Sequence, residues 1–380
     1  MERKIEILGF FNGHQLLDEE GKKADLLKLI ELAGRTCYKS FDKITDNSAK
    51  QFVNKLLRIY KHESVIEHSW SVLNVKYIEN DIKTILSILL LNNLLKISQR
   101  ENQQWLISGN LRMFRDLFRK VSNFREINSL KLIQRSLGSI RKYVLIPLIL
   151  EYPDFFTDIE DKEIKNILSQ QQDEQISEFV VLNPNIKYTP EEKLKHWWLA
   201  IRYIGGSRAF THQLVRHRIC AISQESQRYC DEAGFFDSQY YVIPDSIKEL
   251  NDVKLMDLIG DGSLENNLTL GEWYKSNLLL IDSWYRNLQN FLKMAKEKGM
   301  AKMKVNEDAR FLLPNAVCSE IVVSANLEEW RHISKMRCDT HAQWEIRDFA
   351  MMVLKKAKVL FPTVFDDFQE SEDGKSASLD

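Results

Sequence analysis

Apolar residues recur every three or four positions in several stretches of the chain, which is the spacing of an amphipathic helix. Asp25 is a suitable N-cap for the first stretch, and Gly34 is predicted to end that helix. A second stretch begins near 52 and closes at 61–62. Later helices are predicted over 272–298, from Asn326 with Glu329 as a cap pair, and from Thr340 with Gln343 as a capping box.

Two other apolar runs have the character of strands. Residues 70–78 (WSVLNVKYI) and 196–204 (HWWLAIRYI) are rich in aromatic and β-branched residues. Gly205 and Gly206 are predicted to break the second strand, and a helix is expected to start at Ser207. The chain is therefore expected to be α+β: helix-rich, with a small, mostly antiparallel sheet flanked by helices.

Between these two strands the composition changes. Residues 96–142 contain eleven Lys and Arg against three Asp and Glu, on helical patterns such as 111–118. Residues 151–192 are acidic and polar, and QQQDEQ at 170–175 has the composition of an exposed connection. We therefore divide the chain into a core of residues 1–80 and 196–368, a helical insertion of residues 81–195, and a flexible tail of residues 369–380.

Charge and cysteine content narrow the class of protein. The 380 residues carry 53 Lys and Arg against 54 Asp and Glu, so the net charge of −1 gives no general attraction to nucleic acid. The five cysteines include no C-x-x-C pair, so neither a disulfide framework nor a metal site is predicted, and a reducing cytoplasm is favoured. No apolar run approaches about 20 residues, so no membrane span is expected, and the N-terminus is predicted to be a strand rather than a signal peptide.

The densest polar stretch is 211–229 (THQLVRHRICAISQESQRY), soon after the second strand. Gln213, Arg216 and His217 are three and four positions apart, so they are expected to share one face at the C-terminal end of a helix. The residues at 223–228 are predicted to form a loop of hydroxyl, amide and guanidinium groups. Such groups suit a phosphate and a planar heterocycle with several hydrogen-bonding edges.

This stretch resembles a known family. Arg216-His217-Arg218, followed after seven residues by Ser226, is similar to the R-H-R-x7-S signature of flavin-dependent thymidylate synthases, and SQESQRY at 223–229 agrees with it. Further segments resemble family motifs in the family's order: HESVIEH at 62–68, NEDAR at 306–310, and MRCDTHAQWEI at 336–346.

The resemblance implies the reductive methylation of dUMP to dTMP, a methyltransferase reaction in which methylenetetrahydrofolate gives the carbon and NADPH-reduced FAD gives the hydride. It implies dUMP contacts for Gln213, Arg216, Gln224, Ser226, Gln227, Arg228, Arg310 and Arg337. It implies flavin and folate contacts for His62, Ser64, Arg216, His217, Arg218, Asn326, His332 and His341. Arg337 is expected to activate the pyrimidine, and Ser226 to hydrogen-bond the substrate rather than attack it. A homotetramer is also implied, with different chains supplying Gln213 and Arg216 and the 224–228 segment of each site.

Physical chemistry agrees with these assignments. Guanidinium groups bind phosphate or a carbonyl edge in a bidentate way, and an arginine beside the uracil would stabilise charge that develops when C5 acts as a nucleophile. The chain has no G-x-G-x-x-G turn, so the flavin must be held without one. Ala221 and Cys37 stand where relatives commonly carry small hydroxyl side chains.

Alternative interpretations stay open. The basic residues of 96–142 could bind nucleic acid, in which case the purified protein should lack the yellow colour of a flavin. Cys220, beside the arginines, is the candidate nucleophile of the unrelated cysteine-dependent thymidylate synthases. The segment SGNLRMFR at 108–115 is similar to SANLEEWR at 324–331. We expect this similarity to reflect an asparagine that caps a helix in each segment, and a duplicated site is the alternative interpretation.

Overall fold

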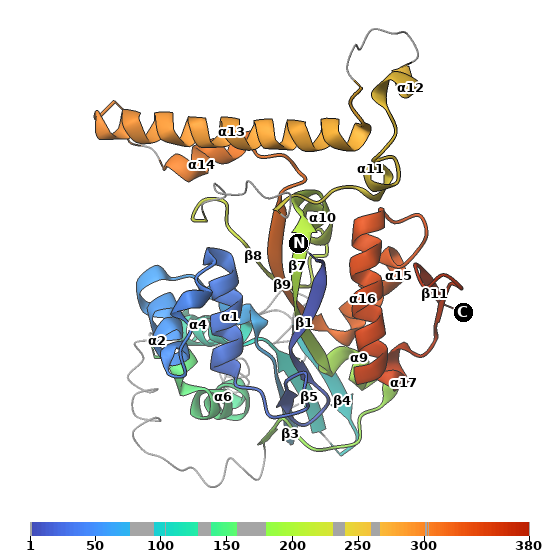
Figure 1. Cartoon of the computed structure of the whole chain (residues 1–380). Coiled ribbons are helices and arrows are strands. Elements are labelled where there is room, and N and C mark those ends of the chain that lie inside the picture. Colours follow the sequence, from blue (N-terminus) through green and yellow to red (C-terminus); the bar gives the residue numbers. More distant parts are fainter. Residues whose placement is uncertain are drawn as a thin grey trace.

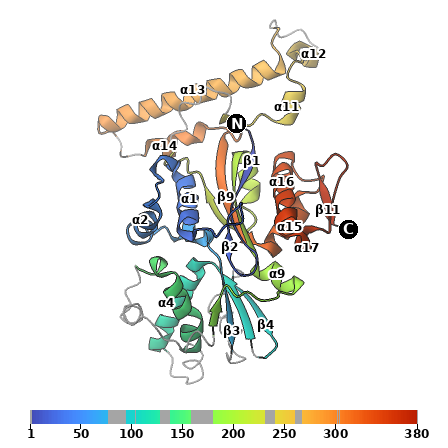
Figure 2. The same cartoon turned by 60° about the horizontal axis from the view of Figure 1, so that its bottom comes forward.

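The computed structural model describes residues 2–76, 95–102, 104–127, 138–157, 180–230, 240–259, 267–300, 302 and 304–379, without the side chains of 122–127. Two sheets form the centre of the molecule (Figures 1 and 2), with strand orders β2-β1-β7-β9-β8 and β4-β5-β3-β6. Every strand pair in them is antiparallel, so the predicted α+β class is confirmed, with two sheets where one was expected. The strands are β1 (Lys4–Phe11), β2 (Leu16–Leu17), β3 (Ser71–Lys76), β4 (Lys96–Arg100), β5 (Gln104–Gly109), β6 (Val180–Leu182), β7 (Trp198–Ser207), β8 (Ala221–Gln224) and β9 (Cys318–Asn326).

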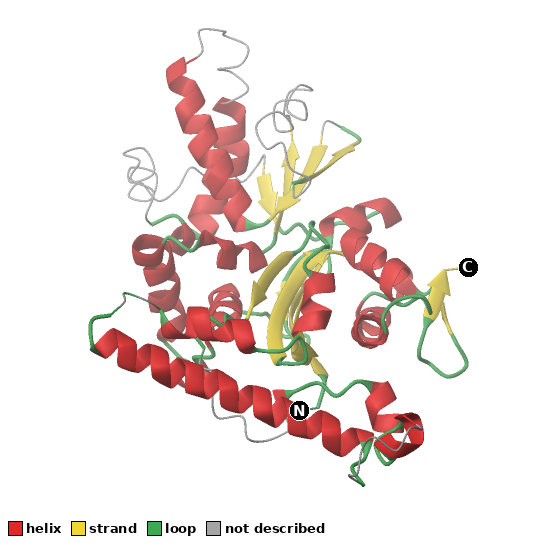
Figure 3. Ribbon diagram, turned by 90° about the horizontal axis from the view of Figure 1, so that it is seen from above, coloured by secondary structure: helices red, strands yellow, loops and turns green. Residues whose placement is uncertain are grey.

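Helices flank the sheets on two sides (Figure 1). One side carries α1 (Leu26–Tyr38), α2 (Ser48–Lys55), α4 (Leu111–Ile127) and α6 (Ile146–Glu151), and the other carries α15 (Leu327–Arg337), α16 (Trp344–Leu360) and α17 (Pro362–Phe365). The long helix α13 (Leu270–Glu297) crosses one end of the molecule beside α14 (Val305–Ala309) (Figure 3). The shorter helices are α9 (Pro190–His196), α10 (Arg208–Leu214), α11 (Asp245–Glu249), α12 (Leu255–Ile259), the 3-10 helices η1 (Phe41–Lys43), η3 (Glu63–His68), η5 (Pro153–Phe155) and η7 (Arg310–Leu312), and the π-helical turns η2 (Leu56–Tyr60) and η4 (Arg141–Leu145). Among the described residues, no helix combines the length and the apolar character needed to cross a bilayer.

The apolar side chains form two large cores. One joins α1, α2, α4 and α6 to the second sheet, and Phe114 is fully buried there. The other joins α15 and α16 to the five-stranded sheet, where the rings of Tyr203, Phe210 and Phe349 pack with centroids 5.0 to 5.1 Å apart. Because Phe210 belongs to α10, this second core fixes the helix that carries Gln213.

The first predicted helix continues through Gly34. α1 has Asp25 as its N-cap, as predicted, and it ends at Tyr38, followed by the C-cap Lys39, whose φ of 46° lies in the left-handed region. A Cβ atom on Gly34 would lie 2.5 Å from the Phe52 ring. The glycine therefore allows the close approach of α2, and the prediction that it ends the helix is wrong.

Two other predicted boundaries are also wrong. Gly205 and Gly206 do not break the strand, because β7 continues to Ser207 through a bulge in which Gly205 adopts a φ of +83°. Gln343, rather than Thr340, caps α16, because its side-chain oxygen accepts hydrogen bonds from two first-turn N–H groups at 3.0 and 3.2 Å. The predicted long helix over 272–298 is confirmed as α13.

The predicted helical insertion of residues 81–195 contains strands as well as helices. α4 and α6 agree with the prediction, but β4, β5 and β6 join β3 in the second sheet. Trp105, Leu106 and Ile107 of β5 are almost fully buried, which explains why this apolar run is a strand. The connection predicted at 170–175 lies outside the described residues. The outer boundaries of the insertion stay a prediction.

The predicted flexible tail forms a hairpin instead. β10 (Phe368–Glu370) pairs with β11 (Ala377–Leu379), and the N–H of Ala377 donates to the carbonyl of Cys338 at 2.9 Å. Ala377 is buried in the core of α15 and α16. This apolar contact holds the end of a segment that is otherwise polar.

Candidate active site

The signature segment is anchored where it leaves β7. Ser207 caps α10 by accepting a hydrogen bond from the N–H of Phe210 at 3.0 Å. Both the N–H and the hydroxyl of Ser207 donate to the buried carboxylate of Glu345, at 2.7 and 2.5 Å. Burial raises the pKa of Glu345, and the two hydrogen bonds from Ser207 oppose that effect. The start of α10 is thus fixed to the start of α16.

The predicted polar helix face is a helix end followed by a turn. α10 ends at Leu214, so Gln213 lies in its last turn while Arg216 and His217 lie in the tightened turn beyond it. The prediction that all three share a helix face is therefore wrong in detail, although the turn keeps them close together in the chain. The Gln213 amide donates to the Gln343 side-chain oxygen at 3.5 Å, which links this turn to the cap of α16.

His217 connects two charged side chains of α15. The Nε of Arg337 donates to Nε2 of His217 at 3.1 Å, and Nδ1 of His217 lies 3.7 Å from the Glu329 carboxylate. Because Nε2 accepts a hydrogen bond, the ring proton of neutral His217 belongs on Nδ1, which faces Glu329. The potential metal-ligand atoms of His217, Glu329 and His332 lie within 4.8 Å of one another, but this tautomer fits a hydrogen-bonded chain better than metal ligation.

The same turn concentrates positive charge. Arg216, Arg218 and Arg337 form no ion pair with any carboxylate in the described part of the chain. Burial lowers the pKa of Arg337, and the nearby charge of Arg216 lowers it further. Arg216 and Arg218 are exposed. A phosphate or a carbonyl edge would therefore meet guanidinium groups whose charge is not already balanced.

A second group of predicted residues lies where β8 ends. The N–H of Ser226 donates to the carbonyl of Cys37 at 3.0 Å. Tyr38 follows Cys37 in the chain, and its hydroxyl lies 2.9 Å from Nδ1 of His62. The Tyr38 ring packs edge-on against the Tyr229 ring, with centroids 5.2 Å apart. The structure thus brings the 62–68 motif and the signature loop together through α1, and Tyr38 is a contact that the sequence did not indicate.

The remaining predicted dUMP residues surround this loop. The Gln224 amide donates to the Thr211 hydroxyl at 2.8 Å, so it ties β8 to α10. Arg228 pairs with Glu307 of α14 at 3.3 Å and is otherwise exposed. The two other residues, Gln227 and Arg310, are half-buried, in the loop and at the start of η7.

The predicted flavin residues differ widely in exposure. Asn326 is buried and caps α15: its oxygen accepts from the N–H of Glu329 at 3.2 Å, and its amide donates to the carbonyl of Lys195 at 3.1 Å. His341 is almost fully exposed and its Nδ1 lies 2.8 Å from the Asp339 carboxylate. The others, Ser64, Arg216, Arg218, His62 and His332, are exposed as well.

Comparison with known proteins identifies the family. The family described as "Thymidylate synthase complementing protein" matches residues 152–363, more than half of the chain. The chain belongs to this family, the flavin-dependent thymidylate synthases. It is 32% identical to the flavin-dependent thymidylate synthase of Clostridium tetani over 193 residues, which are 51% of this chain and 70% of the relative. Those of Nitratidesulfovibrio vulgaris and Corynebacterium efficiens are each 37% identical, over 42% and 45% of this chain and 56% and 62% of their own lengths.

The chain therefore spans between 56% and 70% of the length of these three relatives. A solved structure of the Helicobacter pylori enzyme with FAD and dUMP covers 60% of this chain and 94% of its own, at 16% identity and a TM-score of 0.32. That likeness is too weak to support an argument about the site. The matched range begins at 152, so the family pattern includes part of the predicted insertion and leaves the 62–68 motif outside.

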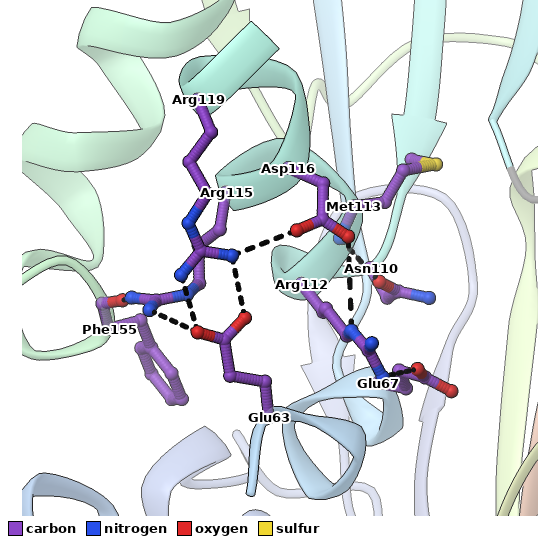
Figure 4. Close-up of polar contacts among 9 residues, drawn as sticks. All are labelled: Glu63, Glu67, Asn110, Arg112, Met113, Arg115, Asp116, Arg119 and Phe155. Atoms are coloured by element: carbon purple, nitrogen blue, oxygen red, sulfur yellow. Dashed lines mark hydrogen bonds and ion pairs between the residues drawn. The ribbon is translucent and has the colours of Figure 1, made fainter. Parts of the chain in front are cut away.

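The family motif at 62–68 is held to α4 by ion pairs (Figure 4). Glu63 accepts hydrogen bonds from Arg115 at 3.0 Å and from Arg119, and Glu67 pairs with Arg112 at 2.5 Å. Burial would raise the pKa of Glu63, but hydrogen bonds from Arg119 and Arg115 lower it to about 2. α4 lies in the predicted insertion, yet its arginines pair with the 62–68 motif of the predicted core.

Cys220 does not have the environment of a nucleophile. Burial raises the pKa of its thiol well above the ordinary value, and the charge of Glu329 raises it further. A reactive cysteine requires the opposite shift, because the thiolate is the nucleophile. The cysteine-dependent mechanism is thus disfavoured on physical grounds, in agreement with the family.

Proposed function

We propose that this chain converts dUMP to dTMP by reductive methylation, with methylenetetrahydrofolate as the carbon donor. The observation that carries this proposal is the cluster of Arg216, Arg218 and Arg337, which no described carboxylate balances. Such a cluster suits the phosphate of a nucleotide and the carbonyl edge of a pyrimidine. Membership of the family adds support, because the relatives are named for this activity.

Arg337 is the residue proposed to activate the pyrimidine. Its Nε is used by His217, so the orientation of the guanidinium is fixed and its outer nitrogens are available to the substrate. Positive charge at the uracil carbonyl edge stabilises the negative charge that develops there when C5 attacks the carbon donor. Ser226 and Gln224 are proposed to hydrogen-bond the nucleotide, as groups that position it and do not attack it.

FAD is proposed to lie against the exposed histidine and arginine side chains of the two groups. Arg216 and Arg218 are exposed cations without a described carboxylate partner, which fits a pyrophosphate, and His62 and Ser64 add hydrogen-bonding groups. FAD, once reduced by NADPH, supplies the hydride of the reaction. The contribution of the chain is to hold the cofactor and the nucleotide and to balance their charge.

We further propose that copies of the chain share each site. The predicted residues form one group around Arg337 and another around Ser226, which supports the family resemblance in assigning them to different chains of one site. The resemblance by itself implies a homotetramer. A cytoplasmic location is also proposed, supported by the five cysteines, all of which are free thiols.

Nucleic-acid binding by the basic residues of 96–142 is the weaker candidate. Arg112, Arg115 and Arg119 of α4 pair with Glu67, Glu63 and Asp116, so their charge is already balanced within the protein. Nucleic-acid binding requires protein cations that replace the counterions of the phosphates, and arginines already paired with carboxylates are not available for that.

The test is dUMP-dependent oxidation of NADPH in the presence of methylenetetrahydrofolate, with flavin absorbance and dUMP titration on the same sample. Arg337→Lys keeps the charge but loses the planar fork, so turnover should fall tenfold or more, about 1.4 kcal/mol, with weaker dUMP binding and unchanged flavin content. Arg331→Lys is the matched control on the same helix, because Arg331 pairs with Asp367 instead. Flavin-loaded wild type without dUMP-dependent oxidation would refute the proposal.

A further inference from the structure

Two buried histidine–serine hydrogen bonds join the first half of the chain to the second half. The Ser324 hydroxyl lies 2.9 Å from Nδ1 of His68, and the Ser108 hydroxyl lies 2.7 Å from Nδ1 of His196. All four residues are buried. His68 and Ser108 come from the first half of the chain, and His196 and Ser324 from the second. Each half therefore gives a serine to the histidine of the other, which is the reciprocity that a two-fold axis produces.

The strands that carry the two serines have equivalent neighbours in the same register. In β5, Ser108 lies opposite Lys96 of β4, and in β9, Ser324 lies opposite Ala221 of β8. In both neighbouring strands the next three residues are Ile-Ser-Gln. The first Ile-Ser-Gln is thus the structural counterpart of the second, which leads into the signature loop.

The strands on the other side of the two serines agree in the same way. β3 places Val72 opposite the first serine, and β7 places Ala200 opposite the second. Counting back four residues from Val72 and from Ala200 leads to His68 and to His196. Counting back two residues leads to a tryptophan in both cases. The cross-bonded histidines therefore occupy equivalent positions.

The helices that follow the serine strands extend the equivalence. Asn110 caps α4 through the N–H of the third helical residue at 2.9 Å, and Asn326 caps α15 in the same way at 3.2 Å. Arg115 and Arg331, five residues after each asparagine, both donate to a backbone carbonyl in a short helix that begins with proline. The two acceptors are the carbonyls of Phe155 in η5 and Val364 in α17. The residues before the two prolines have similar backbone angles, φ −122° and ψ 53° against φ −137° and ψ 58°.

We propose that the chain contains two copies of one unit, repeat 1 (residues 62–156) and repeat 2 (residues 190–365), and that repeat 1 serves repeat 2 as a built-in partner subunit. The two histidine–serine hydrogen bonds then lie in the interface of an internal pseudo-dimer. Repeat 1 is the degenerate copy, because residues 77–94, the counterpart of the R-H-R segment, contain no arginine or histidine. Glu101 stands where repeat 2 has Ser226.

The second site that the pseudo-symmetry would generate is closed by an ion pair. By the same alignment, Arg100 corresponds to Glu225 of the signature loop, and Glu192 corresponds to Ser64 of the 62–68 motif. Arg100 pairs with Glu192 at 2.7 Å and also donates to the carbonyl of Lys187. Cation and carboxylate thus balance each other at the positions of Glu225 and Ser64, and this second site has no counterpart of the R-H-R arginines. Each chain therefore carries one site.

The pseudo-dimer leaves an apolar surface on α13 uncovered. On α13, Trp273, Leu280, Trp284 and Phe291 are spaced by seven, four and seven residues and are 46 to 66% exposed. The opposite face of the helix, with Tyr285 fully buried, covers the rest of the chain. Figure 3 shows α13 along the edge of the molecule. We name the four exposed residues the α13 stripe.

A second copy of the chain is the partner that fits the α13 stripe. Repeat 1 has no counterpart of α13, since only residues 101–103 separate β4 from β5, whereas residues 225–317 separate β8 from β9. Among the residues that the structure describes, the α13 stripe thus has no internal counterpart to cover it. A single self-complementary stripe closes in a two-fold dimer. Two chains then supply four repeats, and the particle is a dimer rather than the tetramer that the family resemblance alone implies.

Light scattering of the full chain tests this inference without reference to catalysis. A particle of about 89 kDa, twice the 44.6 kDa chain, is expected. Trp284→Glu combined with Phe291→Glu should give a single chain with an unchanged circular dichroism spectrum, and Val359→Glu, at a still more exposed apolar residue of α16, should leave the dimer intact. A four-chain wild-type particle, or a double variant of unchanged mass, would overturn the inference.

Two further measurements keep the test decisive if the double variant fails to fold. Oxidation of Trp284→Cys should link two chains into a covalent dimer and should give no larger product. Wild type under the same treatment should stay unlinked. Absence of the covalent dimer would overturn the α13 contact. Flavin absorbance should give one FAD for each chain. This last measurement rests on the proposed function: two FAD for each chain would refute the closed second site, whereas a dimer without flavin would refute the function and leave the duplication standing.

Discussion

Replacement of Glu63 by Gln should destabilise the fold and remove part of its pH dependence. Glu63 joins η3 to α4, and its partner Arg115 has a fully buried side chain (Figure 4). Glu63→Gln keeps the shape of the side chain but removes the negative charge beside Arg115 and Arg119. Loss of one partner from a buried ion pair typically costs about 3 to 5 kcal/mol, because the remaining charge stays in a medium of low polarity.

The pKa of Glu63 gives an independent value for the same quantity. The pKa is about 2 in the folded chain against an ordinary value of 4.5. Since one pKa unit corresponds to about 1.4 kcal/mol, the difference corresponds to about 3.5 kcal/mol, and solvent screening of this incompletely buried group reduces its contribution at neutral pH to about 2 to 3 kcal/mol. A lowered pKa gives stability that is complete above pH 4.5 and is lost as the pH falls from 4.5 toward 2. The difference between wild type and Glu63→Gln should therefore shrink over that range.

Urea unfolding followed by tryptophan fluorescence, from pH 7 down to the acid limit of the folded state, measures this difference. Glu191→Gln is the matched control, because Glu191 occupies the equivalent place in repeat 2 and pairs with Lys195 at the surface, 75% exposed. Its effect should stay within about 0.5 kcal/mol. A Glu63→Gln effect no larger than the control, or one that does not change with pH, would refute the reasoning.

Three other substitutions have clear expectations. Cys220→Ala should retain most dUMP-dependent turnover with a stability loss of about 1 kcal/mol, since burial raises the pKa of this thiol; a loss of turnover of about four orders of magnitude with flavin still bound would revive a cysteine mechanism. Gly34→Ala should cost about 1 to 3 kcal/mol in thermal or urea unfolding, because the new Cβ would lie 2.5 Å from the Phe52 ring, and Phe52→Leu in the same chain should recover part of the loss. Glu329→Gln should lower turnover several-fold with unchanged flavin content, because it loosens the His217 ring that fixes Arg337; unchanged kinetics would show that Arg337 is oriented without it.

Much of the fold follows from local sequence, because local forces decide it. The helical spacing predicts α13, Asp25 caps α1, and the aromatic and β-branched runs predict β3 and β7. The errors fall where a distant contact decides the outcome. Gly34 lies inside its helix because Phe52 approaches it, and the polar tail is ordered because one alanine is buried under α15 and α16. Neither contact leaves a local signal.

The candidate site was partly predictable for a similar reason. The arginine signature is contiguous, so its residues are recognised from the sequence, and they lie in the turn that follows α10. Their partners come from other parts of the chain. Tyr38 meets His62, Glu329 faces His217, and Glu345 receives Ser207, each across a large separation in sequence. Only the packing of the two cores brings such pairs together.

Helix capping explains only part of the similarity between the two repeats. Helix capping accounts for Asn110 and Asn326, as expected from the similar segments that contain them. Capping does not account for the serine that stands two residues before each asparagine. Each serine is needed by a histidine of the other repeat, and a buried polar group left without its hydrogen bond costs about 1 to 3 kcal/mol. Apolar residues of similar volume exchange for less than about 1.5 kcal/mol, so the cores of the two repeats can differ while their cross-bonded polar residues agree. The common origin is therefore visible in the hydrogen bonds of the fold and not in the apolar pattern of the chain.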